Sequence, residues 1–239
     1  MTDLHQQHDS RESENLSAFI QLNKLRLAVY ALLARLYRSE IDQATLDELK
    51  STRFPARTGN RDVDEGYRLL ASYLGSARAN SVQELAIDYA RVFIGHGNDG
   101  FGAAYPFESV YTSKKRLLMQ EARNEVLVFY RKAGLDKNSS WKDPEDHIAI
   151  ELEFLHILCA RAVEAFEKGQ EDTAQALFSD QRKFLEGHLI NWIPMLTADM
   201  KRFTRTSLYK GLAYLTDGFL AVDRNFLCDF LSEDVEMTA

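Results

Sequence analysis

Apolar residues recur at three- and four-residue steps through most of this chain, a spacing that places them on one face of an α-helix. The clearest stretch is residues 16–38, where the repeated apolar positions are Leu22, Leu25, Val29, Leu32, Leu33 and Leu36. We find no stretch in which apolar and polar residues alternate as they do in a half-buried strand. The pattern therefore predicts an all-α protein, a compact bundle of about ten helices.

The same periodicity, together with residues typical of helix ends, predicts the remaining helices. They span residues 42–50, 62–78, 81–95, 112–133, 144–169, 172–186, 188–202 and a last stretch from Thr204 or Thr206 to about 231. Asp42 is predicted as an N-cap, and Ser81 with Glu84 as a capping box. Pro194 is expected to kink or interrupt its helix, because proline has no N–H to donate.

A glycine-rich segment over residues 95–104 separates two of these helices. It lacks the Lys-Ser/Thr ending of a phosphate-binding loop and no strand precedes it, so we interpret it as a flexible approach to residues 105–111. In the helix that follows, over residues 112–133, Leu117 and Leu118 are expected to face the core. The sequence shows no cofactor motif, and we predict no bound cofactor.

The two ends of the chain are polar. Residues 1–15 are predicted to be an N-terminal tail, residues 16–232 a single helical domain, and residues 233–239 a C-terminal tail. The first residues lack the apolar segment of a signal peptide, and no apolar run approaches the roughly 20 residues that span a membrane. We therefore expect a cytoplasmic protein.

Composition narrows the classes of partner. Charged residues make up 27% of the chain and the net charge is −7 at pH 7, which disfavours general binding to nucleic acid or to anionic membranes. An acidic protein is compatible with a basic partner segment. The two cysteines, Cys159 and Cys228, have no metal-type spacing and are expected to be small buried side chains in a reducing compartment.

The helix predicted to begin at Pro144, with Asp143 as its N-cap, has an unusual titratable pair. His147 and Glu151 lie one turn apart near the middle of its apolar face, whereas Glu153 and His156 fall outside it. This apolar face consists of Ile148, Ile150, Leu152, Phe154, Leu155, Ile157 and Leu158. Burial of an unpaired titratable group costs several kcal/mol, so His147 and Glu151 either pin the preceding loop or line a groove.

His147 and Glu151 also have a spacing that suits a metal ion. A metal site needs a third and usually a fourth ligand, and no supporting pattern supplies them. A helical metallohydrolase that uses His147 and Glu151 is therefore the weaker alternative, and we predict no metal site. No Gly-x-Ser-x-Gly motif is present, and we expect no enzymatic activity.

Four segments, in this order, resemble the TorD/DmsD/NarJ family of cytoplasmic chaperones. They are residues 89–93 (Tyr-Ala-Arg-Val-Phe), 105–111 (Tyr-Pro-Phe-Glu-Ser-Val-Tyr), 144–154 with its Pro-Glu-Asp-His start, and 188–194 (His-Leu-Ile-Asn-Trp-Ile-Pro). The resemblance extends over residues 16–231 and is closer to the TorD/DmsD branch. It implies a TorD-like helical chaperone that matures molybdenum-containing anaerobic oxidoreductases.

Similar proteins bind the twin-arginine leader of a partner enzyme and hold it until the molybdenum cofactor is inserted. Such a leader combines two arginines with an apolar stretch, so its recognition requires an apolar groove and acidic groups. The resemblance places the peptide-binding site at Tyr105, Pro106, Glu108, Tyr111, Asp146, His147 and Glu151. Pro106 and Tyr111 could equally shape the loop, and Asp146 could cap its own helix.

The implied partners are a twin-arginine signal peptide and the apo form of a molybdenum oxidoreductase catalytic subunit. An alternative client, by analogy with NarJ-like relatives, is a reductase subunit that is not exported. Members of the family have been linked to guanine nucleotides, but this chain has no nucleotide motif to support that. Helical hairpins joined by glycine-rich loops can exchange between protomers, so a domain-swapped homodimer is compatible with the pattern.

Overall fold

The computed structural model describes residues 2–95 and 102–237, and it places the side chains of residues 17–95 and 102–232. The helices are α1 (Thr2–Arg38), α2 (Gln43–Ser51), α3 (Arg61–Gly75), α4 (Ser81–Tyr89), α5 (Glu108–Thr112), α6 (Glu121–Lys132), α7 (Ile148–Glu167), α8 (Glu171–Phe184), α9 (Ile190–Phe203) and α10 (Ser207–Met237), with π-helical turns η1 (Ala90–Ile94) and η2 (Leu185–Leu189). Extended pairing in these residues is limited to a bridge between Phe107 and His147. The predicted all-α fold is confirmed.

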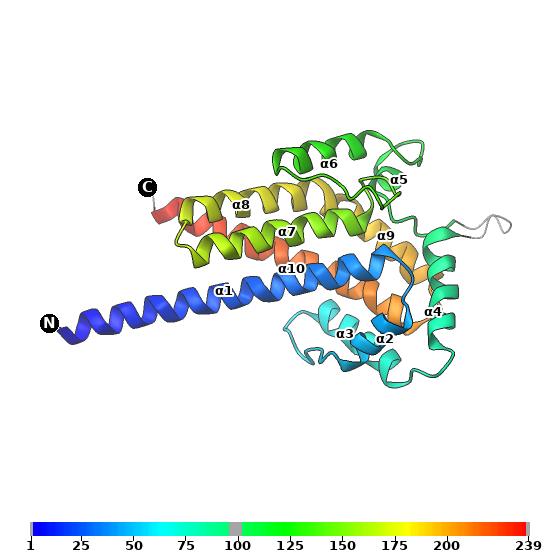
Figure 1. Ribbon diagram of the computed structural model, residues 1–239, viewed down its shortest axis with the longest axis horizontal. Coiled ribbons are helices and arrows are strands. Elements are labelled where there is room, and N and C mark those ends of the chain that lie inside the picture. The colour runs from blue at the N-terminus through cyan, green and yellow to red at the C-terminus, as the bar shows by residue number, and fades with distance from the viewer. Residues whose placement is uncertain (1, 96–101, 238–239) are drawn as a thin grey trace.

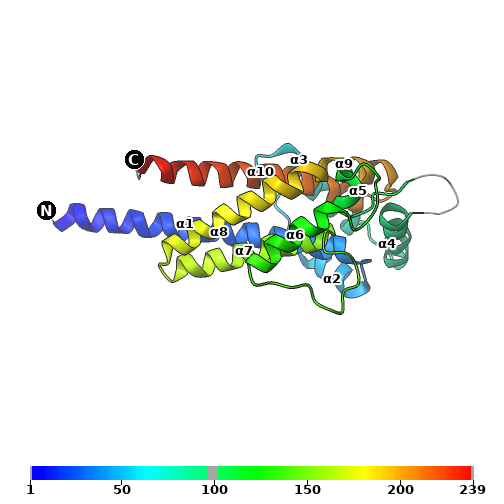
Figure 2. The same cartoon turned by 90° about the horizontal axis from the view of Figure 1, so that it is seen from above.

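The long helices α1, α7, α8 and α10 form the body of the bundle (Figure 1). α1 packs along α7, α7 and α8 form an antiparallel hairpin, and α3 lies against α10. The short helices α5 and α6 lie on one side of this body, and α2 and α3 lie on the other. Both chain ends lie at the same end of the bundle in both views (Figures 1 and 2).

Helices α3 and α10 approach each other closely because glycines lie at their contact. A Cβ on Gly66 would lie 2.6 Å from the Leu215 backbone nitrogen, and one on Gly218 would lie 2.6 Å from the Val63 nitrogen. Neither separation is tolerable for real atoms, so the two helices can pack at this distance only where these side chains are absent.

A buried polar cluster joins α1 to α8 and α10. The Arg26 guanidinium donates to Asp223 Oδ2 at 3.0 Å and to Gln181 Oε1 at 2.8 Å. The Tyr30 hydroxyl donates to the same Asp223 oxygen at 2.6 Å. Arg26 and Asp223 are 4% and 1% exposed, so each charge depends on the other for compensation.

Both terminal helices extend further than predicted. α1 begins at Thr2 instead of residue 16, and α10 continues to Met237 instead of ending near residue 231. Both ends project beyond the other helices (Figure 2). Polar composition indicates that a segment lacks a buried face, but a helix already nucleated on the core can propagate through such residues.

The single helix predicted over residues 112–133 is wrong. α5 ends at Thr112, and α6 begins at Glu121 after a loop in which Arg116 (φ 51°) and Met119 (φ 57°) adopt left-handed conformations. The Ser109 hydroxyl accepts from the Gln120 N–H at 3.0 Å, which holds the start of α6 beside α5. Leu117 and Leu118, predicted to face the core, are therefore 53% and 46% exposed.

Two of the predicted cap motifs have different outcomes. Asp42 is the N-cap of α2, as predicted, and accepts from the Thr45 N–H at 2.7 Å. The capping box of Ser81 and Glu84 is wrong. Ser81 Oγ instead accepts from the Arg78 N–H at 2.8 Å, and the Glu84 carboxylate accepts from the hydroxyl of Tyr73 at 2.7 Å.

The break predicted between residues 186 and 188 is also wrong. The chain remains helical from α8 through the π-helical turn η2 into α9, and Pro194 lies inside α9 without interrupting it. A π turn admits an extra residue without ending the helix, so the glycine at position 187 does not act as a stop. Residues 96–101, most of the predicted glycine-rich segment, lie outside the described residues.

Candidate functional site

Helix α7 begins later than predicted, and this places its polar residues differently. Its first residue is Ile148, and its N-cap is His147, whose Nδ1 accepts from the Ala149 N–H at 3.1 Å. The prediction of Asp143 as N-cap and Pro144 as first helical residue is therefore wrong. Asp143 instead accepts from the indole N–H of Trp141 at 2.6 Å.

The loop motif and the helix motif form one structural unit. The Ile148 N–H donates to the Pro106 carbonyl at 2.9 Å, and the Glu108 N–H donates to the Asp146 carbonyl at 3.0 Å. The Asp146 carboxylate also accepts from the Ser109 N–H, at 2.9 Å. Asp146 thus stabilises the first turn of α5, not that of its own helix as one interpretation of the sequence had it.

Beneath this unit lies a buried cluster of carboxyl groups and ring nitrogens. His188 Nδ1 is 2.9 Å from Glu108 Oε2, and the Trp192 indole N–H donates to Glu151 Oε2 at 3.2 Å. Glu108, Glu151, His188 and Trp192 are each no more than 3% exposed. His188 and Trp192 are absent from the site predicted from the sequence, although the resemblance of residues 188–194 to the family was a signal for them.

The surroundings of Glu151 in this cluster favour its protonated form. Burial, and then the nearby charges of Glu108 and Asp146, raise the pKa of Glu151 well above its ordinary value. No hydrogen-bond donor among the described residues reaches Glu151 Oε1. A proton on Glu151 thus avoids an unpaired charge in the core.

His147 is a neutral ring held between two aromatic side chains. Its centroid lies 5.0 Å from that of Phe107 and 5.5 Å from that of Trp141. Burial lowers the pKa of His147 to about 4. Because its Nδ1 accepts from the Ala149 N–H, the proton of the neutral imidazole is on Nε2.

Most residues of the predicted site are buried. Tyr105 is 39% exposed and Tyr111 is half-buried, with its ring stacked on Trp192 and its hydroxyl donating to Asp199 at 3.1 Å. The remaining five are covered: Pro106, Glu108, Asp146, His147 and Glu151. Pro106, Glu108 and Asp146 join the loop to the start of α7 through hydrogen bonds, and His147 packs against Phe107 of the loop. The Glu151 side chain instead bonds to Trp192 of α9. The part of all five in peptide binding stays a prediction.

His147 and Glu151 each use one polar atom within the fold. His147 Nδ1 accepts from the Ala149 N–H, and Glu151 Oε2 accepts from the Trp192 indole N–H. No group of three or more His, Cys, Asp or Glu side chains in the described residues is arranged to hold a metal ion. The sequence predicted correctly that His147 and Glu151 face inward and that Glu153 and His156 lie outside the apolar face of α7.

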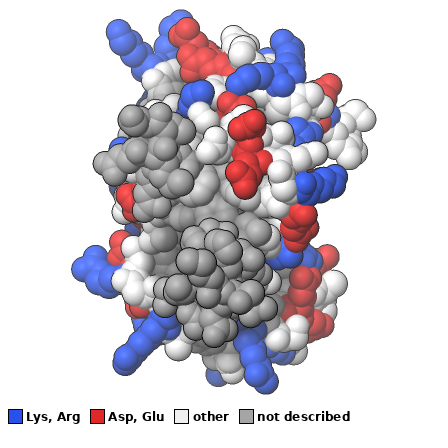
Figure 3. All heavy atoms as spheres, turned by 90° about the vertical axis from the view of Figure 1, so that its left-hand side faces the viewer, with Lys and Arg blue, Asp and Glu red and all other residues white. Residues whose placement is uncertain are grey.

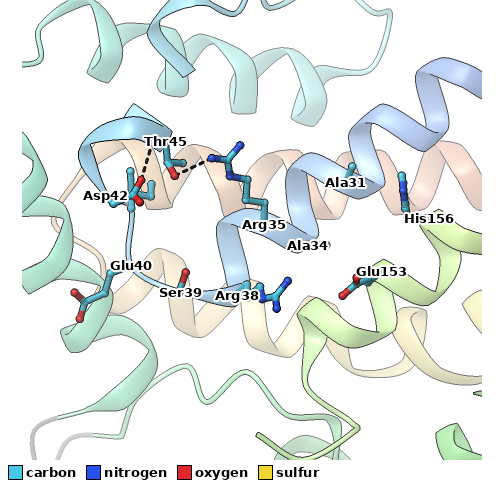
Figure 4. Close-up of a pocket in the computed structure, with 11 residues that line it drawn as sticks. Ala31, Ala34, Arg35, Arg38, Ser39, Glu40, Asp42, Thr45, Glu153 and His156 are labelled. Carbon is cyan, nitrogen blue, oxygen red and sulfur yellow. Dashed lines mark hydrogen bonds between the residues drawn. The ribbon is translucent and has the colours of Figure 1, made fainter. Parts of the chain in front are cut away.

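The surface beside His147 is hollowed by two cavities that share the lining residues Arg38 and Glu153. The first, of about 480 Å³, is lined by Ala31, Ala34, Arg35, Arg38, Ser39, Glu40, Ile41, Asp42, Thr45, Glu153 and His156 (Figure 4). The second, of about 200 Å³, is lined by Arg38, Tyr130, Leu135, Asp136, Lys137, Asn138, Trp141, Ile150, Glu153, Phe154 and Ile157. We call the two together the Arg38 groove.

Trp141 connects this groove to His147. The two rings meet in an edge-to-face arrangement, and the Arg38 guanidinium lies 4.6 Å from the Trp141 ring centroid. Sequence reasoning missed Arg38, Trp141 and Glu153 as site residues. The available signal was the exposed position of Glu153 on the helical wheel of α7, next to the inward-facing Glu151.

The end of the bundle near the two termini differs from the groove. In Figure 3, which views that end, lysine and arginine side chains alternate with aspartate and glutamate among the coloured residues, and neither sign gathers into one continuous patch there. Helices that combine the length and apolar character needed to cross a membrane do not occur in the part of the chain that the structure describes.

Comparison with known proteins identifies the family. The chain is 27% identical over 211 residues to the Chaperone protein TorD of Vibrio vulnificus (strain CMCP6), covering 86% of this chain and 95% of the relative. It is 27% identical over 232 residues to the Chaperone protein TorD of Aliivibrio salmonicida (strain LFI1238), covering 94% and 98%. The relative of the same name in Shewanella pealeana (strain ATCC 700345 / ANG-SQ1) is 26% identical over 224 residues, covering 86% and 91%.

A sequence model of the family described as nitrate reductase delta subunit matches residues 60–198, more than half of the chain. The relatives are named as chaperones and the family is not enzymatic, so the alternative of a metallohydrolase is wrong. The chain therefore belongs to the NarJ/TorD family of molybdoenzyme maturation chaperones, as its four motifs predicted.

Proposed function

We propose that this protein is a cytoplasmic proofreading chaperone that binds the twin-arginine leader of a molybdopterin-containing oxidoreductase until the cofactor is inserted. The observation that carries the proposal is the backbone pairing of Pro106 and Glu108 with Asp146 and Ile148. Two motifs more than 30 residues apart, each characteristic of the family by resemblance, meet there in one unit that also fixes Trp141 at the surface. A chaperone needs such a preformed surface, because ordering a binding loop at each encounter would reduce its affinity.

Under this proposal the buried residues of the unit do not touch the leader but hold the exposed residues in place. His147 holds Trp141 and Phe107, and Asp146 holds the first turn of α5. Tyr105 is the member of the predicted site with the most surface to offer to a peptide. Loss of a buried member should therefore weaken leader binding by displacing its exposed neighbours.

The test is calorimetric titration of a synthetic twin-arginine leader into the wild-type protein and a His147→Asn variant. Asparagine is among the best N-cap residues, so this variant can keep the start of α7 while losing the ring between Phe107 and Trp141. We expect at least about a tenfold weaker affinity in the variant, as for a mispositioned binding group. A Glu164→Gln variant, at an exposed position of α7, is the matched control and should bind like wild type.

Two results would contradict the proposal, and each would refute a different part of it. A wild-type protein that does not bind the leader would refute the leader-binding function itself. A His147→Asn variant that melts at the wild-type temperature and binds equally well would refute the positioning role of His147.

The description of the matching family as nitrate reductase delta subunit favours a second client. In that case the partner is a reductase subunit that is not exported and carries no twin-arginine leader. Co-purification of the chaperone with its client, followed by sequencing of the client's N-terminus, distinguishes the two. Guanine-nucleotide binding and a domain-swapped homodimer stay predictions.

A further inference from the structure

Some charged side chains of the Arg38 groove form ion pairs within the protein, and others do not. Among its basic side chains, Arg35 pairs with Glu48 and donates to Thr45 at 3.0 Å, and Lys137 pairs with Glu145 at 3.1 Å. Glu40 and Glu153 are exposed and have no ion-pair partner among the described residues. The charge that the groove offers to a ligand is therefore negative, apart from Arg38 itself.

The position of Arg38 shows that the groove can accommodate a guanidinium group. Its guanidinium lies over the Trp141 ring, and Figure 4 shows it pointing from α1 toward Glu153 on α7. An aromatic face with a carboxylate beside it is a recognised environment for a guanidinium group. Arg38 occupies this environment without forming an ion pair with Glu153, so an arginine from another chain could replace it at little cost.

The two free carboxylates lie at opposite ends of the first cavity, Glu153 near His156 and Glu40 beyond Ser39 (Figure 4). In an extended peptide, successive side chains point in opposite directions. Two adjacent arginines in an extended segment would thus direct one guanidinium toward each end of the cavity.

The second cavity provides the apolar part of the groove. Its lining includes Leu135, Ile150, Phe154 and Ile157, and it adjoins the first cavity at Arg38 and Glu153. A ligand with cationic side chains at one end and an apolar run next to them would match the two cavities in order. This is the composition of the leader segment in the proposed function.

We propose that the Arg38 groove is the place where the leader's paired arginines bind, and that Arg38 is a built-in competitor that must leave Trp141 when they enter. This inference rests on the proposed function and specifies its surface. One leader arginine stacks on Trp141 beside Glu153, the other faces Glu40, and the apolar run enters the second cavity. His147 contributes through its edge-to-face contact with the Trp141 ring.

The test is fluorescence anisotropy of a labelled twin-arginine leader with variants at exposed groove positions, which leave the core intact. Glu153→Gln and Glu40→Gln should each weaken binding about threefold, and the double variant about tenfold, as for partly exposed charge pairs. The affinity of the double variant should also fall less between about 50 and 300 mM salt than that of wild type, because fewer charge pairs are screened. Glu164→Gln is again the control on α7.

An Arg38→Gln variant tests the competition directly. It should bind the leader more tightly than wild type by about threefold or more, because it removes a like charge and uncovers Trp141. Weaker binding by this variant would overturn the inference, since the groove would then recognise an anionic group. A leader with lysines in place of both arginines should bind more weakly than the arginine form, because an ammonium group stacks less well on indole.

Failure of this inference is distinguishable from failure of the proposed function. If the leader binds wild type but the Glu40→Gln/Glu153→Gln double variant binds it equally well, the leader uses another surface and only the inference is overturned. If wild type binds no leader, the proposed function itself is refuted.

Discussion

The raised pKa of Glu151 predicts how the free energy of unfolding depends on pH. Glu151 is fully buried, and its pKa is raised well above 4.5 by burial and by the charges of Glu108 and Asp146. A Glu151→Gln variant has nearly the same shape and cannot ionise. Its amide oxygen can still accept from the Trp192 indole N–H, which donates to Glu151 at 3.2 Å in the wild type.

The sign and size of the effect follow from proton linkage. Above pH 4.5 the unfolded chain loses the Glu151 proton while the folded protein keeps it, so folding binds a proton. Between that pH and the folded-state pKa, the wild-type free energy of unfolding therefore falls by about 1.4 kcal/mol per pH unit from this group. The variant lacks this contribution, so its free energy of unfolding should rise relative to that of wild type as the pH increases from 5 toward the folded-state pKa of Glu151.

Urea denaturation followed by circular dichroism, at pH 5, 6 and 7, measures this difference. Other titrating groups change both proteins equally and cancel when the two free energies are subtracted. Glu153→Gln, an exposed position two residues away, is the matched control and should run parallel to wild type. Curves for Glu151→Gln and wild type that stay parallel over this range would refute the raised pKa of Glu151.

Three further predictions concern other parts of the molecule. Because burial lowers the pKa of His147 to about 4, wild type should lose about 1.4 kcal/mol per unit as pH falls from 6.5 toward that value, and thermal melts of His147→Asn should lack this loss. Asp223→Ala leaves the buried Arg26 without a counter-charge and should cost about 3–5 kcal/mol in urea denaturation; an unchanged midpoint would contradict the buried ion pair. Gly66→Ala would bring a methyl group 2.6 Å from the Leu215 nitrogen and should cost about 1–3 kcal/mol in the same assay. Gly75→Ala, which meets nothing within 4 Å, is its control, and equal stability of the two variants would exclude close packing of α3 on α10.

His147 and the Arg38 groove are coupled through Trp141. Trp141 contacts the buried ring of His147, and the exposed Arg38 guanidinium lies over the Trp141 ring. A substitution of His147 can therefore change a binding surface that His147 does not line, which explains how this buried residue would affect a peptide ligand. The loss of affinity expected for His147→Asn and the gain expected for Arg38→Gln measure the two sides of the same contact.

The sequence by itself determined the helical class, most of the helices and the inward orientation of His147 and Glu151. These properties depend on spacing along one helix, because residues three and four apart share a face whatever the rest of the chain does. The order of the four motifs likewise indicated the family.

Only the tertiary structure decided where α7 begins, what Asp146 binds and why residues 112–133 do not form one helix. The hydrogen bond of Ile148 to Pro106 fixes where α7 begins, and Asp146 binds the Ser109 N–H. The hydrogen bond between Ser109 and Gln120 holds α6 as a separate helix beside α5. Each polar group could have been satisfied locally, as the sequence predicted. A distant donor or acceptor satisfied it instead, since a buried polar group takes whichever partner the packed fold brings within hydrogen-bonding distance.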